Sequence, residues 1–330
     1  MLEDAPFDLL CPGRRPAGLG PVFLPFGEDA TPDWDGFAHL LGRVVDTTLI
    51  PAINLGPGAV DLVDASVRAE VLATAGAALG GRPFVAGVRA TDGADGRFDP
   101  ERLAGAVASV ERQGAIPLLL PSPTLATLAA DELVGLVAWM GDWCERLLVV
   151  EGTPGQAPGG ATHGIDVFRA LLELGPCIGV VHASGRRADE WDRLRLRDEH
   201  RSSFQVFSAN VHAVDQIAYG ADHALDLAAA VPDALADRDE AWAREDLGAV
   251  ERDDALQALA TLVFRAPAAA ARHSLALVLR LRGWLPHDRS HPQVPRRPDG
   301  EEDLLRPALE RLGLLDDGGP AGLEASASGS

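Results

Sequence analysis

The stretch Ile178-Gly179-Val180-Val181-His182-Ala183-Ser184-Gly185 is a run of apolar residues that ends in small and polar ones. Short apolar runs between turn signals are typical of strands that are buried on both faces of a parallel sheet. A longer segment of helical period follows this run. The two segments together therefore indicate one βα unit.

The same pattern occurs eight times along the chain. Helix starts such as Thr31-Pro32-Asp33 and Asp99-Pro100-Glu101, with a capping oxygen beside a proline, separate the runs. Eight strands with intervening helices predict an α/β fold, a (β/α)8 TIM barrel. The expected strands are Pro21 to Phe26, Leu49 to Leu55, Pro83 to Arg89, Ile116 to Leu120, Leu147 to Glu151, Ile178 to Ala183, Phe204 to Ser208 and Ala224 to Ala228.

After Pro232 the strand signal stops and helical periods predict a C-terminal helical extension. Four prolines between Pro286 and Pro298 predict a connector without helix. We therefore expect a lead-in at 1–19, the barrel at 20–231, the extension at 232–316 and a disordered tail at 317–330. The expected helices of the extension are Asp233 to Glu245, Asp253 to Phe264, Pro267 to Arg282 and Glu302 to Leu312.

The composition narrows the class of protein. With 330 residues, 47% hydrophobic content and a mean hydropathy of +0.04, the chain has enough apolar side chains for a large core. A net charge of −20 would repel phosphate backbones, so nucleic acid is not an expected partner. No apolar run is long enough to span a bilayer and the N-terminus lacks a basic leader, so we expect no membrane association and a cytoplasmic protein. Cys11, Cys144 and Cys177 are too far apart for a disulfide framework or a zinc site.

All 29 basic residues of the chain are arginine, and lysine is absent from the sequence. A GC-rich coding bias would explain this, since Ala, Gly, Pro and Asp are also frequent. Whatever its origin, the absence excludes chemistry that needs a lysine side-chain amine, because the delocalised guanidinium of arginine cannot form a Schiff base.

Four segments fall in the order found in the dihydrodipicolinate synthase and N-acetylneuraminate lyase family, which the chain resembles over roughly residues 20 to 315. Ile178 to Gly185 is similar to that family's Gly-Ile-Lys-x-Ala-Ser-Gly strand six. The other three are Pro21 to Phe26 as first strand, Glu151-Gly152-Thr153-Pro154-Gly155 at the place of Tyr-Asn-x-Pro-Gly, and Tyr219-Gly220-Ala221-Asp222 before strand eight.

The resemblance implies a barrel with a helical extension, a keto-acid substrate and a homo-oligomer, a tetramer or a dimer. In the family, a strand-six lysine forms the Schiff base and a strand-five tyrosine relays protons. The matching positions hold Val181 and Glu151. The segment Asn54-Leu55-Gly56-Pro57-Gly58 replaces a hydroxyl-rich carboxylate site, and Ser122-Pro123 lies where tyrosines are expected.

Glu151 is the first candidate catalytic residue. Strand alternation puts Val149 and Glu151 on one side, and the resemblance implies that this side faces into the barrel. Burial in an apolar mouth would raise the pKa of this carboxyl and suit it to acid or base catalysis. The alternative is a structural carboxylate, satisfied by backbone amides or by Arg89.

His182 is a second catalytic candidate, although alternation from an inward Val181 would turn it toward the helices as a structural residue. Arg89 could bind a substrate carboxylate, or could be an ordinary surface or ion-paired arginine. The remaining candidates for substrate binding lie at other strand ends and could equally be loop residues: Asn54, Ser122, Ser208 and Asn210.

We expect no cofactor and no metal. A metal site needs several converging carboxylates or histidines, and the only carboxylates near the carboxyl ends of the expected strands are Glu28, Asp29, Asp61 and Glu151. The leading hypothesis is a carbon-carbon or carbon-oxygen lyase that binds a small keto or hydroxy acid without a Schiff base. The alternative is a catalytically dead barrel that serves as a ligand sensor or partner subunit.

Overall fold

The computed structural model describes residues 7–90, 98–152, 160–209 and 214–315. Its centre is an eight-stranded parallel sheet in which each strand pairs with the next one along the chain. A bridge between Gly18 and His223 brings the last strand beside the first and nearly closes the barrel. The strands are β1 (Leu19–Pro21), β2 (Ile50–Ile53), β3 (Phe84–Arg89), β4 (Ala115–Leu120), β5 (Leu147–Gly152), β6 (Cys177–Ala183), β7 (Gln205–Ser208) and β8 (Asp222–His223).

The predicted (β/α)8 barrel with its C-terminal helices is thus confirmed, but the bounds of its first and last strands were wrong. β1 lies earlier than Pro21–Phe26, and β8 lies before Ala224–Ala228. The apolar run after β8 forms the short 3₁₀ helix η3 (Asp226–Ala229), which buries Leu227 and Ala228. Short apolar runs have no periodicity that distinguishes a strand from a buried turn of helix.

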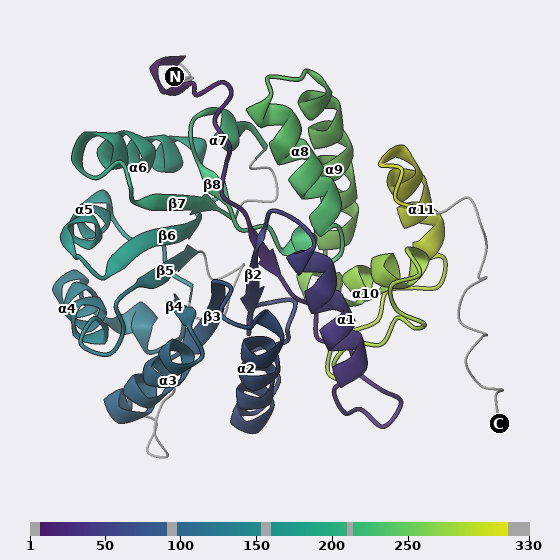
Figure 1. The fold of residues 1–330 in the computed structure, drawn as a ribbon, viewed down its shortest axis with the longest axis horizontal. Coiled ribbons are helices and arrows are strands. Elements are labelled where there is room, and N and C mark those ends of the chain that lie inside the picture. Colours follow the sequence, from purple (N-terminus) through teal and green to yellow (C-terminus); the bar gives the residue numbers. More distant parts are fainter. Residues whose placement is uncertain (1–6, 91–97, 153–159, 210–213, 316–330) are drawn as a thin grey trace.

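Helices surround the strands, as Figure 1 shows for α2 to α6 in an arc outside the sheet. Asp33 and Asp99 cap α1 and α3 through hydrogen bonds from Gly36 N (2.9 Å) and Arg102 N (3.1 Å), as their sequence signals predicted. The helices are α1 (Trp34–Val45), α2 (Ala65–Leu79), α3 (Pro100–Arg112), α4 (Ala130–Met140), α5 (Ile165–Glu173), α6 (Arg187–His200), α7 (Val214–Ala218) and α8 (Pro232–Ala243).

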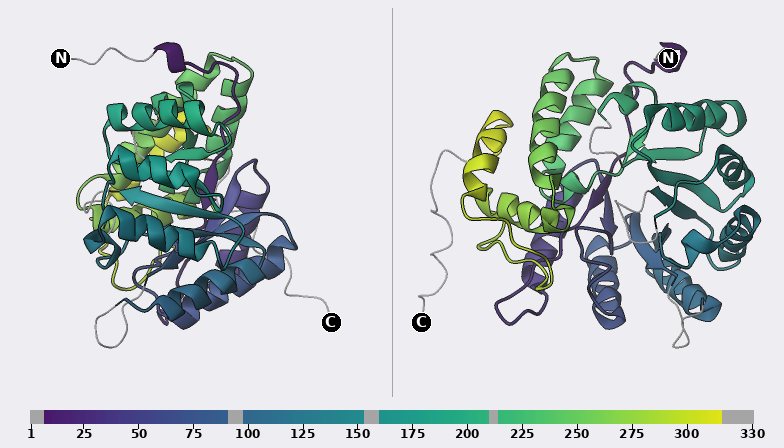
Figure 2. Two further views of the ribbon diagram at one scale, coloured as in Figure 1. Left: turned by 90° about the vertical axis from the view of Figure 1, so that its left-hand side faces the viewer. Right: turned by 180° about the vertical axis from the view of Figure 1, so that it is seen from behind.

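The expected extension begins with α8, the first of its predicted helices, which packs against both α1 and α9. The extension continues with α9 (Gly248–Phe264), α10 (Ala271–Leu281) and α11 (Glu301–Arg311). The right-hand view of Figure 2 shows the extension beside the barrel. The connector 286–298 is without helix, as predicted, and is fixed by Arg297, whose Nε donates to Ser274 Oγ at 2.9 Å. Among the described helices, none is by itself long and apolar enough to cross a bilayer. Taken together, α9 and the segment 268–281 have the length and the composition of a membrane span, but they are bent by 110° relative to each other.

The strands present two different faces. One face packs against the helices in the main core, to which Val149 and Val180 belong. The other forms an apolar cluster along the barrel axis, which we call the interior cluster. Its buried members are Leu19, Ala52, Leu55, Val85, Ile116, Leu118, Leu148, Val181 and Phe207.

Candidate functional site

Val181, at the position where the resemblance places a Schiff-base lysine, is a member of the interior cluster and is 6% exposed. It pairs in register with Val150 on one side and Phe207 on the other. The barrel axis at this level is therefore apolar, with no titratable side chain at the reacting position.

Glu151 faces the helices and not the barrel interior, so the predicted orientation was wrong. Leu148 and Val150 contact the interior cluster, whereas Val149 belongs to the main core, and alternation carries Glu151 to the same side as Val149. The inward neighbour of Val181 is consequently Val150.

The environment of Glu151 also differs from the one we expected. The side chain is fully buried, and Arg193 of α6 contacts both carboxylate oxygens, Nε to Oε2 at 2.8 Å and Nη2 to Oε1 at 3.3 Å. Burial acts to raise the pKa of Glu151, but the hydrogen bond from His182 and the charge of Arg193 outweigh it, so the pKa is lowered. Glu151 is an ionised carboxylate held by a buried arginine.

His182 faces the helices, as alternation predicted, and is fully buried. It pairs in register with Glu151, and its Nδ1 lies 2.8 Å from Glu151 Oε2. Its other ring nitrogen, Nε2, lies 2.9 Å from the hydroxyl oxygen of Ser184. The two predicted catalytic residues are therefore in direct contact, together with Arg193 and Ser184, which sequence reasoning did not select.

Of the predicted binding residues that the structure describes, Arg89 is the one that points toward the mouth of the barrel. Val85 lies in the interior cluster, and alternation carries Arg89 to the same side of β3. Its Nη1 donates to Val60 O at 3.3 Å, in the loop after β2, and no carboxylate of the described residues forms an ion pair with it. The nearby charge of Arg89 adds to burial in lowering the pKa of Arg68.

The other binding candidates are dispersed. Asn54 has a positive φ of 54° and turns away, so that its Nδ2 donates to Arg68 O at 3.1 Å and Leu55 enters the interior cluster in its place. Ser122 Oγ accepts a hydrogen bond from Leu125 N at 3.2 Å within its own turn. Ser208 is fully buried, and its hydroxyl has no partner within the described residues. Asn210 lies outside the described residues.

Asp226 is a mouth residue that the sequence reasoning missed. It begins η3 directly after β8, and its carboxylate reaches the loop after β2, where Gly56 has no side chain to obstruct it. The side chain is exposed to solvent, and desolvation by the surrounding protein raises its pKa to about 6, against the opposing charge of Arg272. Because the eighth strand was expected over Ala224–Ala228, Asp226 was assigned to the middle of a strand and was not considered as a site residue.

The extension takes part in this mouth. Arg272 of α10 donates from Nε to Gly56 O at 2.6 Å and forms an ion pair with Asp61. Arg289 of the connector donates from Nε to Phe26 O at 3.3 Å, beyond β1. Loops of β1, β2 and β8 and the extension thus meet on one side of the barrel.

The carboxylates considered for a metal do not converge. Glu28 is exposed, Asp29 accepts from Thr31 Oγ1 at 2.7 Å, and Asp61 pairs with Arg272. Over the described parts of the chain, no group of three or more His, Cys, Asp or Glu side chains is placed to hold a metal ion.

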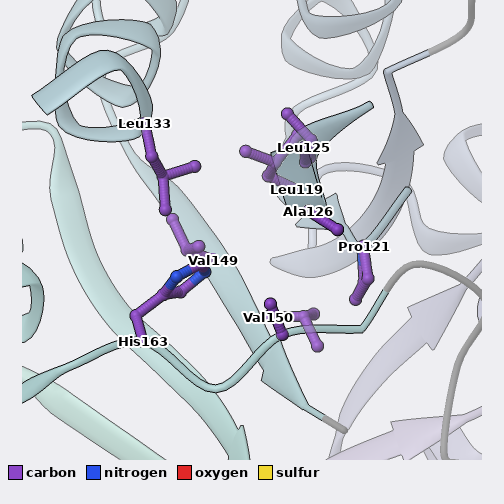
Figure 3. A pocket seen from close by; sticks show the side chains of 9 residues that line it. Leu119, Pro121, Leu125, Ala126, Leu133, Val149, Val150 and His163 are labelled. Carbon is purple, nitrogen blue, oxygen red and sulfur yellow. The ribbon is translucent and has the colours of Figure 1, made fainter. Parts of the chain in front are cut away.

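A small apolar pocket of about 20 Å³ lies outside the barrel, between β4, β5 and α4. Figure 3 shows His163, on the chain after β5, directed toward Val149 and Leu133 in this pocket. Burial and the charge of Arg193 lower the pKa of His163, while Glu151 opposes them. A neutral imidazole against valine and leucine is a packing arrangement, and we assign it no role.

The strand order and the mouth define a (β/α)8 barrel of the kind that has its functional loops at the carboxyl ends of the strands. No family model and no curated protein matches the sequence. Solved structures do match. A protein described as the first monomeric dihydrodipicolinate synthase variant is 18% identical, with 94% of this chain and 100% of that chain covered and a TM-score of 0.77.

Dihydrodipicolinate synthase from Thermotoga maritima is 16% identical, with 91% and 99% covered and a TM-score of 0.75. The prophage protein YagE of E. coli, of the dihydrodipicolinic acid synthase family and solved in complex with pyruvate, is 14% identical, with 91% and 99% covered and a TM-score of 0.79. The fold of this chain is therefore that of the dihydrodipicolinate synthase family, extension included.

Proposed function

We propose that the protein is a lyase on a small keto or hydroxy acid, acting at the barrel mouth without a Schiff base and without a cofactor. The observation that carries this proposal is Asp226, an accessible carboxylate at the end of a barrel strand with a pKa raised to about 6. A group that titrates near neutral pH is suited to proton transfer. The likeness of the fold to pyruvate-binding proteins supports an acid as substrate.

Two side chains that contact the loop after β2, Arg89 at the end of β3 and Asp226 at the start of η3, would divide the work. Arg89 would bind the substrate carboxylate, because a guanidinium pairs with it through two parallel hydrogen bonds. Asp226 would act as the base that takes the proton from the hydroxyl or the carbon next to the breaking bond. Arg272, whose charge already acts on Asp226, would stabilise the negative charge left on the product.

The pH dependence of turnover tests this role. With a panel of hydroxy and keto acids, we expect kcat/KM to rise with pH through a midpoint of about 6, because Asp226 must be ionised to accept a proton. Asp226→Asn should lower kcat about 10²- to 10⁴-fold at pH 7.5, the usual contribution of a general base. Asp142→Asn, in an exposed turn, is the control and should change nothing.

Borohydride should leave the mass of the protein unchanged in the presence of substrate, because no imine forms. Full activity in Asp226→Asn, or a borohydride-trapped adduct, would contradict the proposal.

One observation favours a second function, that of a catalytically dead barrel which binds a ligand or a partner subunit. Val181 packs with Leu148 and Phe207 where the resemblance places the reacting amine. If an acid from the panel binds and no acid is turned over, this second function is supported.

We further propose a cytoplasmic homo-oligomer that binds neither nucleic acid nor membrane. The net charge of −20 supports the exclusion of nucleic acid. Leu247 and Val250, which are 84% and 56% exposed near the start of α9, offer an apolar surface for a second copy.

A further inference from the structure

A second constellation of reactive side chains lies outside the barrel, between the ends of β5 and β6 and helix α6. Ser184 follows β6, and its hydroxyl oxygen lies 2.9 Å from His182 Nε2. His182 Nδ1 lies 2.8 Å from Glu151 Oε2. The three side chains form an unbroken line from an accessible hydroxyl through an imidazole to a buried carboxylate.

The carboxylate fixes which nitrogen of His182 carries the proton. Ionised Glu151 can only accept, so Nδ1 must donate to it, and this leaves the lone pair of Nε2 for the hydroxyl of Ser184. Arg193 holds both oxygens of Glu151, and its Nη1 and Nη2 also donate to Asp189 O and His163 O, at 2.9 and 2.8 Å. The imidazole is therefore held rigidly by its surroundings.

Ser184 lines an open pocket at the surface of the protein. The chain after β5 forms one wall through Thr162, Gly164 and Ile165, and α6 forms the other through Asp189 and Asp192. The hydroxyl oxygen accepts a hydrogen bond from Arg186 N at 3.1 Å, and Arg186 O at 3.3 Å is a second, more distant acceptor for the hydroxyl proton besides His182 Nε2 at 2.9 Å. Arg186 is the N-cap residue of α6, with no side-chain cap. A substrate carbonyl bound at Ser184 would thus lie beside the positive end of a 14-residue helix.

We propose that Ser184, His182 and Glu151 form a nucleophilic triad that hydrolyses esters, at a site separate from the barrel mouth. Ser184 is the nucleophile, His182 is the general base, and Glu151 is a positioning residue. The order along the line of contacts, hydroxyl to imidazole to carboxylate, is the one that serine hydrolases use on unrelated folds.

The reaction balances with water as the only co-substrate. Ser184 Oγ attacks the ester carbonyl carbon while its proton passes to His182 Nε2. The tetrahedral intermediate then collapses, the bond to the alcohol oxygen breaks, and His182 returns the proton to the departing alcohol. Water attacks the acyl-serine in the same way, releases the carboxylic acid and restores the hydroxyl of Ser184.

The pocket selects the class of ester. Arg186, Asp189 and Asp192 supply charges of both signs to its walls, and among its described lining residues Ile165 is the one large apolar side chain. Such walls cannot desolvate a long alkyl chain favourably. The site therefore fits esters of short acyl groups, of which p-nitrophenyl acetate is a suitable probe.

Covalent labelling tests the proposal on the unaltered full-length protein. A fluorophosphonate reagent should add one label, which peptide mass mapping places on Ser184, because only an activated serine reacts with it at neutral pH. Labelling of another residue, or no labelling, would overturn the proposal. This measurement needs no variant and is independent of folding defects.

Hydrolysis of p-nitrophenyl acetate provides the second measurement. Ser184→Ala should lose the label and reduce the rate above background at least 100-fold, with an unchanged melting temperature. Ser203→Ala, an exposed serine in the turn before β7, is the matched control and should retain both label and rate. Equal rates in Ser184→Ala and Ser203→Ala would refute the triad. Arg89→Met should leave the label in place, so failure at the barrel mouth and failure of the triad are separable.

Discussion

Replacing Arg193 by methionine is expected to lower the free energy of unfolding by about 3–5 kcal/mol at pH 7. The variant leaves Glu151 buried beside His182 without the guanidinium that contacts both of its oxygens. A buried charge that has lost its partner is strongly destabilising, since desolvation is no longer offset. Urea unfolding followed by circular dichroism would measure the change.

The pH dependence of this loss has a definite sign. The lowered pKa of Glu151 contributes stability that is present above the ordinary carboxyl pKa and is lost as the pH falls through the lowered value. Without Arg193, burial should raise the pKa, and the carboxyl would fold protonated. The difference between the two proteins should therefore shrink in acid.

Arg195→Met is the matched control on the same helix. Its guanidinium lies 3.4 Å from Asp8, and the two side chains are 44% and 69% exposed. Exposed pairs of this kind contribute about 0–1 kcal/mol, so the control should unfold almost as the wild type does. Equal losses in the two variants would contradict the assignment of Arg193 as the partner that stabilises Glu151.

Gly87→Ala is expected to destabilise the barrel by about 3 kcal/mol, the upper range for overpacking a core. A Cβ at Gly87 would overlap the carbonyl oxygen of Asn54 and approach Leu120 Cδ1 to 2.9 Å. Because the first obstacle is backbone, it can be relieved only by moving the end of β2. The same unfolding measurement applies.

Gly105→Ala, inside α3, is the control for Gly87→Ala. Beyond the adjacent residues and the backbone of its own helix, no atom lies within 4 Å of a Cβ at Gly105, so the change should raise stability by about 0.5–1 kcal/mol through helix propensity. A Gly87→Ala protein as stable as the wild type would show that the chain after β2 is free to move, and that the close contact of Asn54 with β3 is not required.

The repeat of apolar runs predicted the barrel and its extension because eight βα units admit few other arrangements. It misplaced β1 and β8 because these strands are short. β8 is two residues long, and its His223 N donates to Ala17 O at 3.0 Å, in a lead-in segment with no strand pattern. That hydrogen bond joins residues about 200 positions apart, which local periodicity cannot reveal.

The site was harder to predict because it depends on which way side chains face. Alternation along β6 placed His182 correctly, but the facing of β5 rested on a resemblance and put Glu151 on the wrong side. The two expectations were inconsistent, since neighbouring parallel strands in register share their faces, and Glu151 pairs with His182. The register of β5 and β6 comes from the structure, so the sequence alone could not reveal this inconsistency.

Binding of small acids to the barrel mouth is the most direct test of the proposed function. Thermal-shift measurements on the full-length protein, with keto, hydroxy and sugar acids, would detect it because a ligand that binds the native state raises the melting temperature. Arg82→Met, an exposed arginine in the turn before β3, serves as the control for Arg89→Met. We predict a rise with at least one acid in the wild type and in Arg82→Met, and a Kd about 10- to 100-fold weaker in Arg89→Met, the usual value of a charge-assisted hydrogen bond. No rise with any acid, or equal affinity in Arg89→Met, would contradict an acid-binding site at the mouth of this barrel.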